Sequence, residues 1–319
     1  MWRIFVILRL AALALALALA SPVQAQDKLT VLLDWFVNPD HAPLVIAREQ
    51  GFFAEHGLEV ELIAPADPND PPKLVAAGQA DIAVSYQPQL HLQVAEGLPL
   101  RRIGTAVATP LNSLVVLADG PIEGIADLEG RKVGFSVGGF EDALLGAMLE
   151  KHGLTLGDIE LVNVNFSLSP ALVAGQVDAV IGAFRNFELN QMELIERPGR
   201  AFYPEEEGVP AYDELIYVAH VDKLGDPRLQ RFMEAVEAAT HWIVNHPNEA
   251  WEVFAATDPL LDDELNRLAW ADTVPRLALS PAALDHHRYA RFAAFLVERG
   301  LLEEALPVGG YAVDLFASD

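Results

Sequence analysis

The chain has 319 residues, of which 52% are hydrophobic, and a formal net charge of −25. Its length and apolar content exclude a disordered chain and exceed what one minimal domain needs, so two lobes of ordinary size are expected. The acidic excess disfavours DNA, RNA and anionic membranes as partners, and no nucleic-acid partner is predicted.

The first 25 residues have the pattern of an export signal. Arg3 precedes the apolar run "LAALALALALA", and "SPVQA" ends at the small residue Ala25. The run from Leu10 to Ala20 is shorter than the roughly 20 residues that span a bilayer, which favours a cleaved signal peptide (1–25) over a retained anchor. The chain contains no cysteine, so neither a lipidated signal nor a disulfide framework is expected. These features predict a soluble, non-lipidated periplasmic protein.

A faint internal repeat follows the signal. "FAEHGLEVELI" (53–63) is echoed by "LEKHGLTLGDIELV" (149–162), and "KLVAAGQADIAV" (73–84) by "ALVAGQVDAVIG" (171–182). Both pairs keep nearly the same offset, from His56 to His152 and from Gly78 to Gly175. This shared register indicates a duplication.

Each copy predicts three strands that alternate with helices ending at the glycine of "HGL" or "AGQ". Such alternation is typical of parallel βαβ units, so each copy should form an α/β lobe. The predicted strands lie near 29–33, 58–63 and 81–85 in the first copy, and near 131–136, 159–164 and 178–183 in the second.

Strand-like segments flank the second copy and predict that the chain passes twice between the lobes. "NSLVVLAD" (112–119) and "DELIYVAH" (213–220) mark these crossings, which would form a two-segment hinge. Lobe 1 is predicted to contain 26–115 and 217–319, and lobe 2 to contain 116–216. Helices predicted over 226–246, 247–257 and 281–300 should pack on lobe 1.

Ligands of open parallel sheets bind beyond the carboxyl ends of the strands, which selects the loops 34–41, 85–89, 136–142 and 184–188. These loops combine aromatic rings with acids and amides, which suit a flat heterocycle that is neutral or cationic. Asp34 could instead cap a helix, and the rings could be core. The predicted ligand-binding residues are Asp34, Trp35, Asn38, His41, Tyr86, Ser136, Gly138, Gly139, Phe140, Glu141, Phe184, Asn186 and Glu188.

Motifs of catalysis and metal binding are absent from the sequence. There is no "HExxH", no "GxSxG" and no cysteine nucleophile, and "FSVGGFED" lacks the lysine of a phosphate-binding loop. His286 and His287 are adjacent and would splay apart on a helix. We therefore predict no catalytic residue, metal or cofactor.

The segments "LDWFVNPDHAPLVIAREQGFF" and "PADPNDPPKLVAAGQADIAVSY" resemble the periplasmic pyrimidine-precursor binding proteins of thiamine salvage and the related fungal pyrimidine synthases. The resemblance runs from about 29 to 246. It implies a two-lobed α/β fold of the type II periplasmic-binding-protein class, with a ligand cleft between the lobes. It also implies delivery of a formylaminopyrimidine or hydroxymethylpyrimidine to an ABC permease and its ATPase. A monomer is expected.

Carried onto this sequence, the resemblance assigns ligand contacts to the first loop, Tyr86, the "SVGGFE" loop and Glu188. Relatives that bind other solutes, such as flavin precursors, keep a different heterocycle open as an alternative. An enzymatic alternative is disfavoured, because Ser85 and Gln89 stand where the synthases have a cofactor lysine and a histidine, and "GVPAYD" stands where they have a cysteine-rich run.

Overall fold

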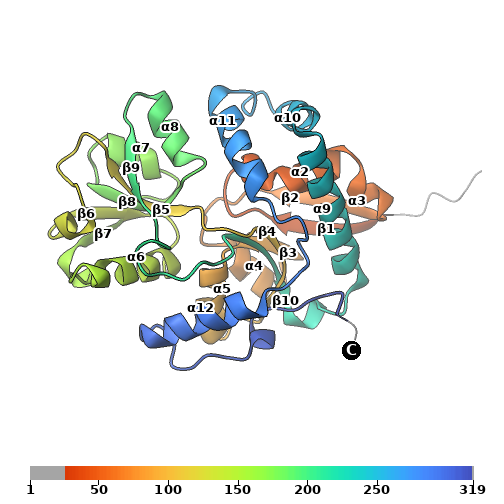
Figure 1. The fold of residues 1–319 in the computed structure, drawn as a ribbon. Helices are drawn as coiled ribbons and strands as arrows, with labels where there is room; N and C mark the ends of the chain where they lie inside the picture. Colours follow the sequence, from red (N-terminus) through yellow and green to blue (C-terminus); the bar gives the residue numbers. More distant parts are fainter. Residues whose placement is uncertain (1–25, 318–319) are drawn as a thin grey trace, which may run out of the picture.

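The computed structural model describes residues 26–317 and folds into two α/β lobes, each built on a five-stranded sheet (Figure 1). The first sheet has the order β2-β1-β3-β10-β4 and the second β7-β6-β8-β5-β9. The first sheet contains β1 (Asp27–Leu32), β2 (Leu58–Ile63), β3 (Ile82–Ser85), β4 (Leu100–Val107) and β10 (Leu215–His220). The second contains β5 (Asn112–Leu117), β6 (Lys132–Phe135), β7 (Glu160–Asn163), β8 (Ala179–Phe184) and β9 (Gly199–Phe202).

The two sheets have the same topology, as the internal repeat predicts. In each, three parallel strands from one copy are followed by an antiparallel strand, β10 beside β3 and β5 beside β8. The six strands predicted for the two copies are all present. The outer strands β4 and β9 are not among the predicted strands.

The chain leaves the first sheet after β4 and returns to it at β10, so two segments connect the lobes. The predicted boundaries after 115 and 216 fall inside β5 and β10, and each crossing therefore comes earlier in the chain, at 108–111 and 203–214. Glu214 joins the two segments, because its buried carboxylate accepts hydrogen bonds from the backbone N–H groups of Leu111 (2.6 Å) and Asn112 (2.9 Å).

Helices cover both sheets, and short 3-10 turns occur between them. In chain order the helices of the first half are α2 (Ala42–Glu49), α3 (Phe52–Glu55), α4 (Pro71–Ala76), α5 (Gln87–Ala95) and α6 (Phe140–Lys151). Those that follow are α7 (Leu168–Val173), α8 (Glu188–Leu194), α9 (Pro227–Asn245), α10 (Pro247–Ala255), α11 (Glu264–Thr273) and α12 (His286–Glu298). The 3-10 turn η1 (Pro39–His41) lies in the loop after β1.

Two features of the C-terminal helices differ from the prediction. The third predicted helix begins at His286 rather than at 281, because the Asp285 side chain accepts from the N–H of Arg288 and caps the helix there. Helix α11, which is capped by Asp263, is not among the predicted helices. Helix α9 packs on α2 and α3 of lobe 1, whereas α11 contacts both η1 of lobe 1 and α8 of lobe 2.

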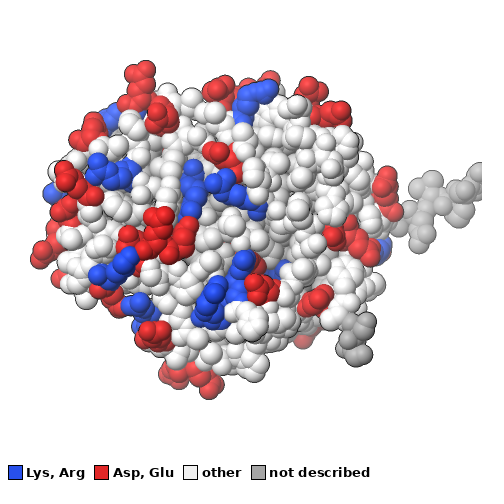
Figure 2. Space-filling view, in the orientation of Figure 1, with Lys and Arg blue, Asp and Glu red and all other residues white. Residues whose placement is uncertain are grey.

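Acidic side chains are spread over the face shown in Figure 2, and basic ones form small groups near its middle. In the part of the chain from 26 to 317, no helix combines the length and the apolarity needed to cross a membrane. The predicted signal peptide (1–25) lies outside the described residues.

Candidate functional site

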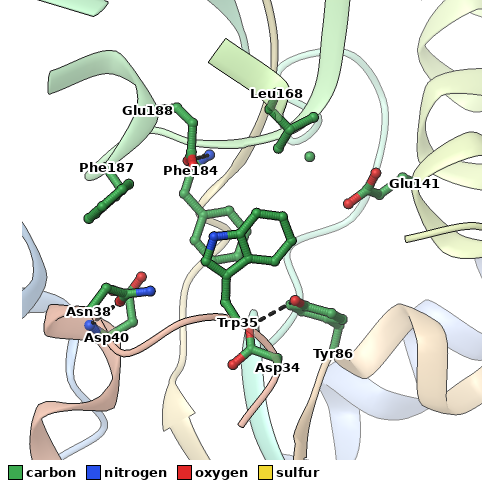
Figure 3. A pocket seen from close by; sticks show the side chains of 11 residues that line it. Asp34, Trp35, Asn38, Asp40, Tyr86, Glu141, Leu168, Phe184, Phe187 and Glu188 are labelled. Atoms are coloured by element: carbon green, nitrogen blue, oxygen red, sulfur yellow. Dashed lines mark hydrogen bonds between the residues drawn. The ribbon is translucent and has the colours of Figure 1, made fainter. Parts of the chain in front are cut away.

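A small cavity of about 30 Å³ lies between the lobes, at the carboxyl ends of the parallel strands. Figure 3 shows Trp35 in its centre, with Glu141 on one side and Phe187 and Asp40 on the other. Among the described residues that line it, none is a lysine, arginine or histidine. They are Asp34, Trp35, Asn38, Asp40, Tyr86, Glu141, Leu168, Gly182, Phe184, Phe187 and Glu188.

The loop after β1 is held by its own polar side chains. The Asn38 side chain accepts from the Asp40 N–H (2.8 Å) and donates to the Phe36 carbonyl (3.2 Å), so it caps η1. His41 Nδ1 accepts from the Asn38 N–H (3.3 Å), which leaves Nε2 to donate to Asp34 Oδ1 (2.9 Å). The Tyr86 hydroxyl donates to Asp34 Oδ2 (2.8 Å). Both Asp34 oxygens are thus held by hydrogen bonds. His41 orients Asp34 but does not itself line the cavity.

Aromatic rings from both lobes meet in the cleft. The Trp35 ring, from lobe 1, lies 4.5 Å from Phe166 of lobe 2 between centroids. Tyr86 stacks on Phe140 across the lobes, with centroids 4.7 Å apart and an interplanar angle of 24°. The cleft therefore presents flat apolar faces to whatever enters it.

Lobe 2 contributes two buried carboxyl groups. Glu141, in the first turn of α6, accepts from the Ser136 N–H (2.8 Å), and Glu188, in the first turn of α8, accepts from the Phe184 N–H (2.7 Å). Burial raises the pKa of each to about 8, against the lowering effect of these hydrogen bonds. Both carboxyl groups are therefore mainly protonated at neutral pH and can donate as well as accept.

Asp40 bridges the lobes. Its Oδ1 accepts from Asn186 Nδ2 of lobe 2 (2.6 Å) and from Thr273 Oγ1 of α11 (3.0 Å). Burial raises the pKa of Asp40 to about 6, despite the lowering effect of His41 and of these two donors. Asn190 of α8 also donates to Asp272 of α11 (2.9 Å), so the lobes are in contact and the arrangement is closed.

The structure brings seven of the predicted residues to the cavity: Asp34, Trp35, Asn38, Tyr86, Glu141, Phe184 and Glu188. The other predicted residues lie around it. Phe140 is buried beneath Tyr86, and Asn186 bonds to Asp40. The Ser136 hydroxyl donates to the Asn165 carbonyl. Gly138 and Gly139 border a separate hollow of about 240 Å³, and the N–H of Gly138 donates to Asn69 of lobe 1 (3.0 Å).

Four lining residues were missing from the predicted set. Asp40 and Phe187 stand in loops that the sequence had selected, so the signal was present for them. Leu168 begins α7, and Gly182 lies inside β8 with φ +96°. Gly182 could have been recognised from the sequence, because a glycine within a strand often marks the close approach of another group. Here that group is the Glu141 carboxyl.

Within 26–317 there is no group of three or more His, Cys, Asp or Glu side chains placed to hold a metal ion. The acids of the cavity are instead paired with backbone N–H groups and with Tyr86, Asn186 and Thr273.

The raised pKa values of Glu141 and Glu188 predict that stability falls as pH rises. The unfolded chain ionises these groups near pH 4.5, whereas the folded chain keeps them protonated up to about pH 8. Their contribution is therefore complete below pH 4.5 and is lost as the pH rises to about 8. We expect the melting temperature of the double variant Glu141→Gln, Glu188→Gln to depend less on pH between 5 and 8 than that of the wild type.

Thermal unfolding at several pH values measures this difference. Glu61→Gln, which changes an exposed acid on β2, is the matched control and should keep the wild-type pH profile. A double variant whose profile parallels the wild type would show that these carboxyl groups are ionised in the folded protein.

A family model described as "NMT1/THI5 like" matches residues 38–250. The chain belongs to the NMT1/THI5-like family. Three of its relatives are informative. A Haemophilus influenzae protein whose name places it in thiamine biosynthesis is 53% identical over 97% of this chain and 99% of its own length. The formylaminopyrimidine-binding protein of Halalkalibacterium halodurans is 35% identical over 73% of this chain and 72% of its own length. The 4-amino-5-hydroxymethyl-2-methylpyrimidine phosphate synthase of Uromyces fabae is 29% identical over 76% of this chain and 74% of its own length.

Among solved structures, the alkanesulfonate-binding protein SsuA of Xanthomonas axonopodis pv. citri superposes with a TM-score of 0.72 at 16% identity. The match covers 92% of this chain and 99% of that one. This member of the NMT1/THI5-like family therefore has the two-lobed fold of periplasmic binding proteins, as the sequence resemblance implied.

Proposed function

We propose that the protein is the periplasmic solute-binding component of an ABC importer and that its ligand is a pyrimidine precursor of thiamine. The observation that carries this proposal is the lining of the interlobe cavity, which combines aromatic faces with four carboxyl groups. Rings suit the face of a heterocycle, and carboxyl groups suit its amino substituents and ring nitrogens. The name of the Halalkalibacterium halodurans relative supports a formylaminopyrimidine. A hydroxymethylpyrimidine has the same aromatic ring and ring nitrogens and is the other candidate.

The cavity chemistry also argues against anionic cargo. A sulfonate or phosphate would face Asp34, Asp40, Glu141 and Glu188, with no cation among the described lining residues. The likeness to the sulfonate-binding protein therefore extends to the fold and not to the ligand. Another flat heterocycle, such as a flavin precursor, is the alternative that this lining also accommodates.

An enzymatic role is disfavoured by what the cleft offers. Ser85 donates its hydroxyl to Gln89 (2.9 Å), and both side chains are buried, so the positions of the synthase lysine and histidine carry a neutral hydrogen-bonded pair. With no cofactor lysine at this position, we propose that the protein binds its ligand without changing it.

Mass spectrometry of small molecules released from the purified, denatured protein tests the proposed ligand. Recovery of an unmodified aminopyrimidine, and its rebinding in calorimetric titration, is the expected result. Release of a flavin precursor would select the alternative. Conversion of an added pyrimidine to a new product would instead establish an enzyme.

We predict that ligand binding closes the lobes around the hinge formed by 108–111 and 203–214. A cavity of about 30 Å³ is far below the roughly 300–1,000 Å³ of typical ligand sites, so entry requires an opening of the lobes or a shift of Trp35. Small-angle scattering should show a smaller radius of gyration with saturating pyrimidine than without it. An identical radius in both states would argue for entry by side-chain motion alone.

A further inference from the structure

The Asp40 carboxyl group has one satisfied and one unsatisfied oxygen. Asn186 and Thr273 both donate to Oδ1, whereas Oδ2 is buried without a hydrogen-bond partner among the described residues. Asp40 is only 3% exposed and lines the cavity. Asn186 Oδ1 is likewise buried and unpartnered in the part of the chain that the structure describes.

A buried acceptor without a donor destabilises the folded protein, so two of them in one cluster indicate that a donor belongs there. The donor has to come from within the cavity, because Asp40 is enclosed by its own loop, by Asn186 and by α11. A group with hydrogens to give, rather than lone pairs, fits this end of the site.

Glu188 provides a second acceptor in the same cavity. Burial is the main cause of its raised pKa, and the negative charge of Asp40 adds to it. Its Oε2 receives the Phe184 N–H, which leaves Oε1 to the cavity, where a donor from the ligand would favour the ionised form of the group and use this oxygen as an acceptor. One acid belongs to lobe 1 and the other to lobe 2, and both line the cavity.

Resting on the proposed function, we propose that Asp40 determines specificity by accepting a hydrogen bond from the exocyclic amino group of the pyrimidine, whose second hydrogen goes to Glu188. An amino group carries two hydrogens and can satisfy both acids at once. An oxo group at the same ring position carries lone pairs and would meet Asp40 Oδ2 as a second acceptor. Because the acids belong to different lobes, the amino group also stabilises the closed form.

The variant Asp40→Asn tests this assignment by exchanging one atom. The donors from Asn186 and Thr273 require an acceptor at Oδ1, so they orient the new amide with its oxygen toward them. Its NH2 group then occupies the place of Oδ2, where an acceptor becomes a donor. Calorimetric titration would use a 4-aminopyrimidine and the matched 4-oxo compound with identical other substituents.

We expect wild type to prefer the amino compound and Asp40→Asn to lose at least tenfold in affinity for it. The variant should hold the oxo compound as well as wild type or better, so that the preference is reversed. Asp40→Ser, which removes the carboxyl group without adding an NH2 at this point, should lose the preference without reversing it, and provides a second test if the asparagine variant folds poorly.

Asp272→Asn is the matched control, because Asp272 accepts from Asn190 across the lobes but does not line the cavity. It should lower the affinity for both compounds equally. If Asp40→Asn also lowers both affinities equally, Asp40 only holds the lobes together or binds a water molecule, and the assignment is wrong. If wild type binds neither compound, the proposed function fails and the assignment with it.

Discussion

Trp35→Ala should lower the affinity for every flat ligand by roughly ten- to hundredfold. The Trp35 ring stands in the centre of the cavity, so a heterocycle that enters has to lie against it. Stacking on an aromatic side chain contributes about 1–3 kcal/mol per base, which corresponds to that range of affinity. The loss should be the same for amino and oxo pyrimidines, because stacking does not distinguish their edges.

Calorimetric titration of Trp35→Ala against both compounds measures the loss. Trp242→Ala is the control, since Trp242 lies on α9 beside His246, with centroids 5.6 Å apart, away from the cleft. It should bind as wild type does. Wild-type affinity in Trp35→Ala would mean that the ligand site lies elsewhere.

Gly182→Ala should lower both stability and ligand affinity. Gly182 has φ +96°, and a Cβ there would lie 2.6 Å from Cδ of Glu141. The Glu141 side chain would have to leave its place, which separates its carboxyl group from the Ser136 N–H. We expect at least a tenfold loss of pyrimidine affinity, because one wall of the cavity is displaced.

The control Gly175→Ala distinguishes the effect of backbone strain from the effect of a collision with Glu141. Gly175 also has a positive φ, +69°, but a Cβ there would meet no atom within 4 Å. A left-handed conformation costs an L residue roughly 1–2 kcal/mol, so Gly175→Ala should be destabilised by about that much and keep full affinity. Gly182→Ala should be destabilised further. Equal unfolding free energies in the two variants, with binding intact, would contradict the close approach of Glu141.

The repeat made most of the fold predictable, because a strand predicted in one copy is supported by the strand predicted at the corresponding position of the other. The edge strand β4 was missed because "LRRIGTAV" contains two arginines and reads as polar. Arg102 is nevertheless fully buried, and it donates to the carbonyls of Pro281 (2.9 Å) and Ala282 (2.9 Å). Those partners are about 180 residues away along the chain, so no local pattern could reveal them.

The site was predictable as a set of loops but not as a set of contacts. The rule that ligands bind beyond parallel strands selected the loop of Trp35 and the loop of Glu188. It could not show that Asp40 of one lobe meets Asn186 of the other, since this depends on how the lobes are docked. Gly138 and Gly139 were predicted to contact ligand, whereas the structure places them at the hollow beyond Phe140.

The position of β10 has a consequence for the order in which the protein acquires its structure. Lobe 2 uses β5 to β9, one uninterrupted stretch of chain, whereas the first sheet needs β10 between β3 and β4. Lobe 1 therefore cannot complete its sheet until the chain has emerged beyond residue 220, when lobe 2 is already available in full. A chain that leaves a ribosome or a translocation pore amino end first should thus fold its inserted lobe before its terminal lobe, with β3 and β4 lacking the strand between them in the meantime.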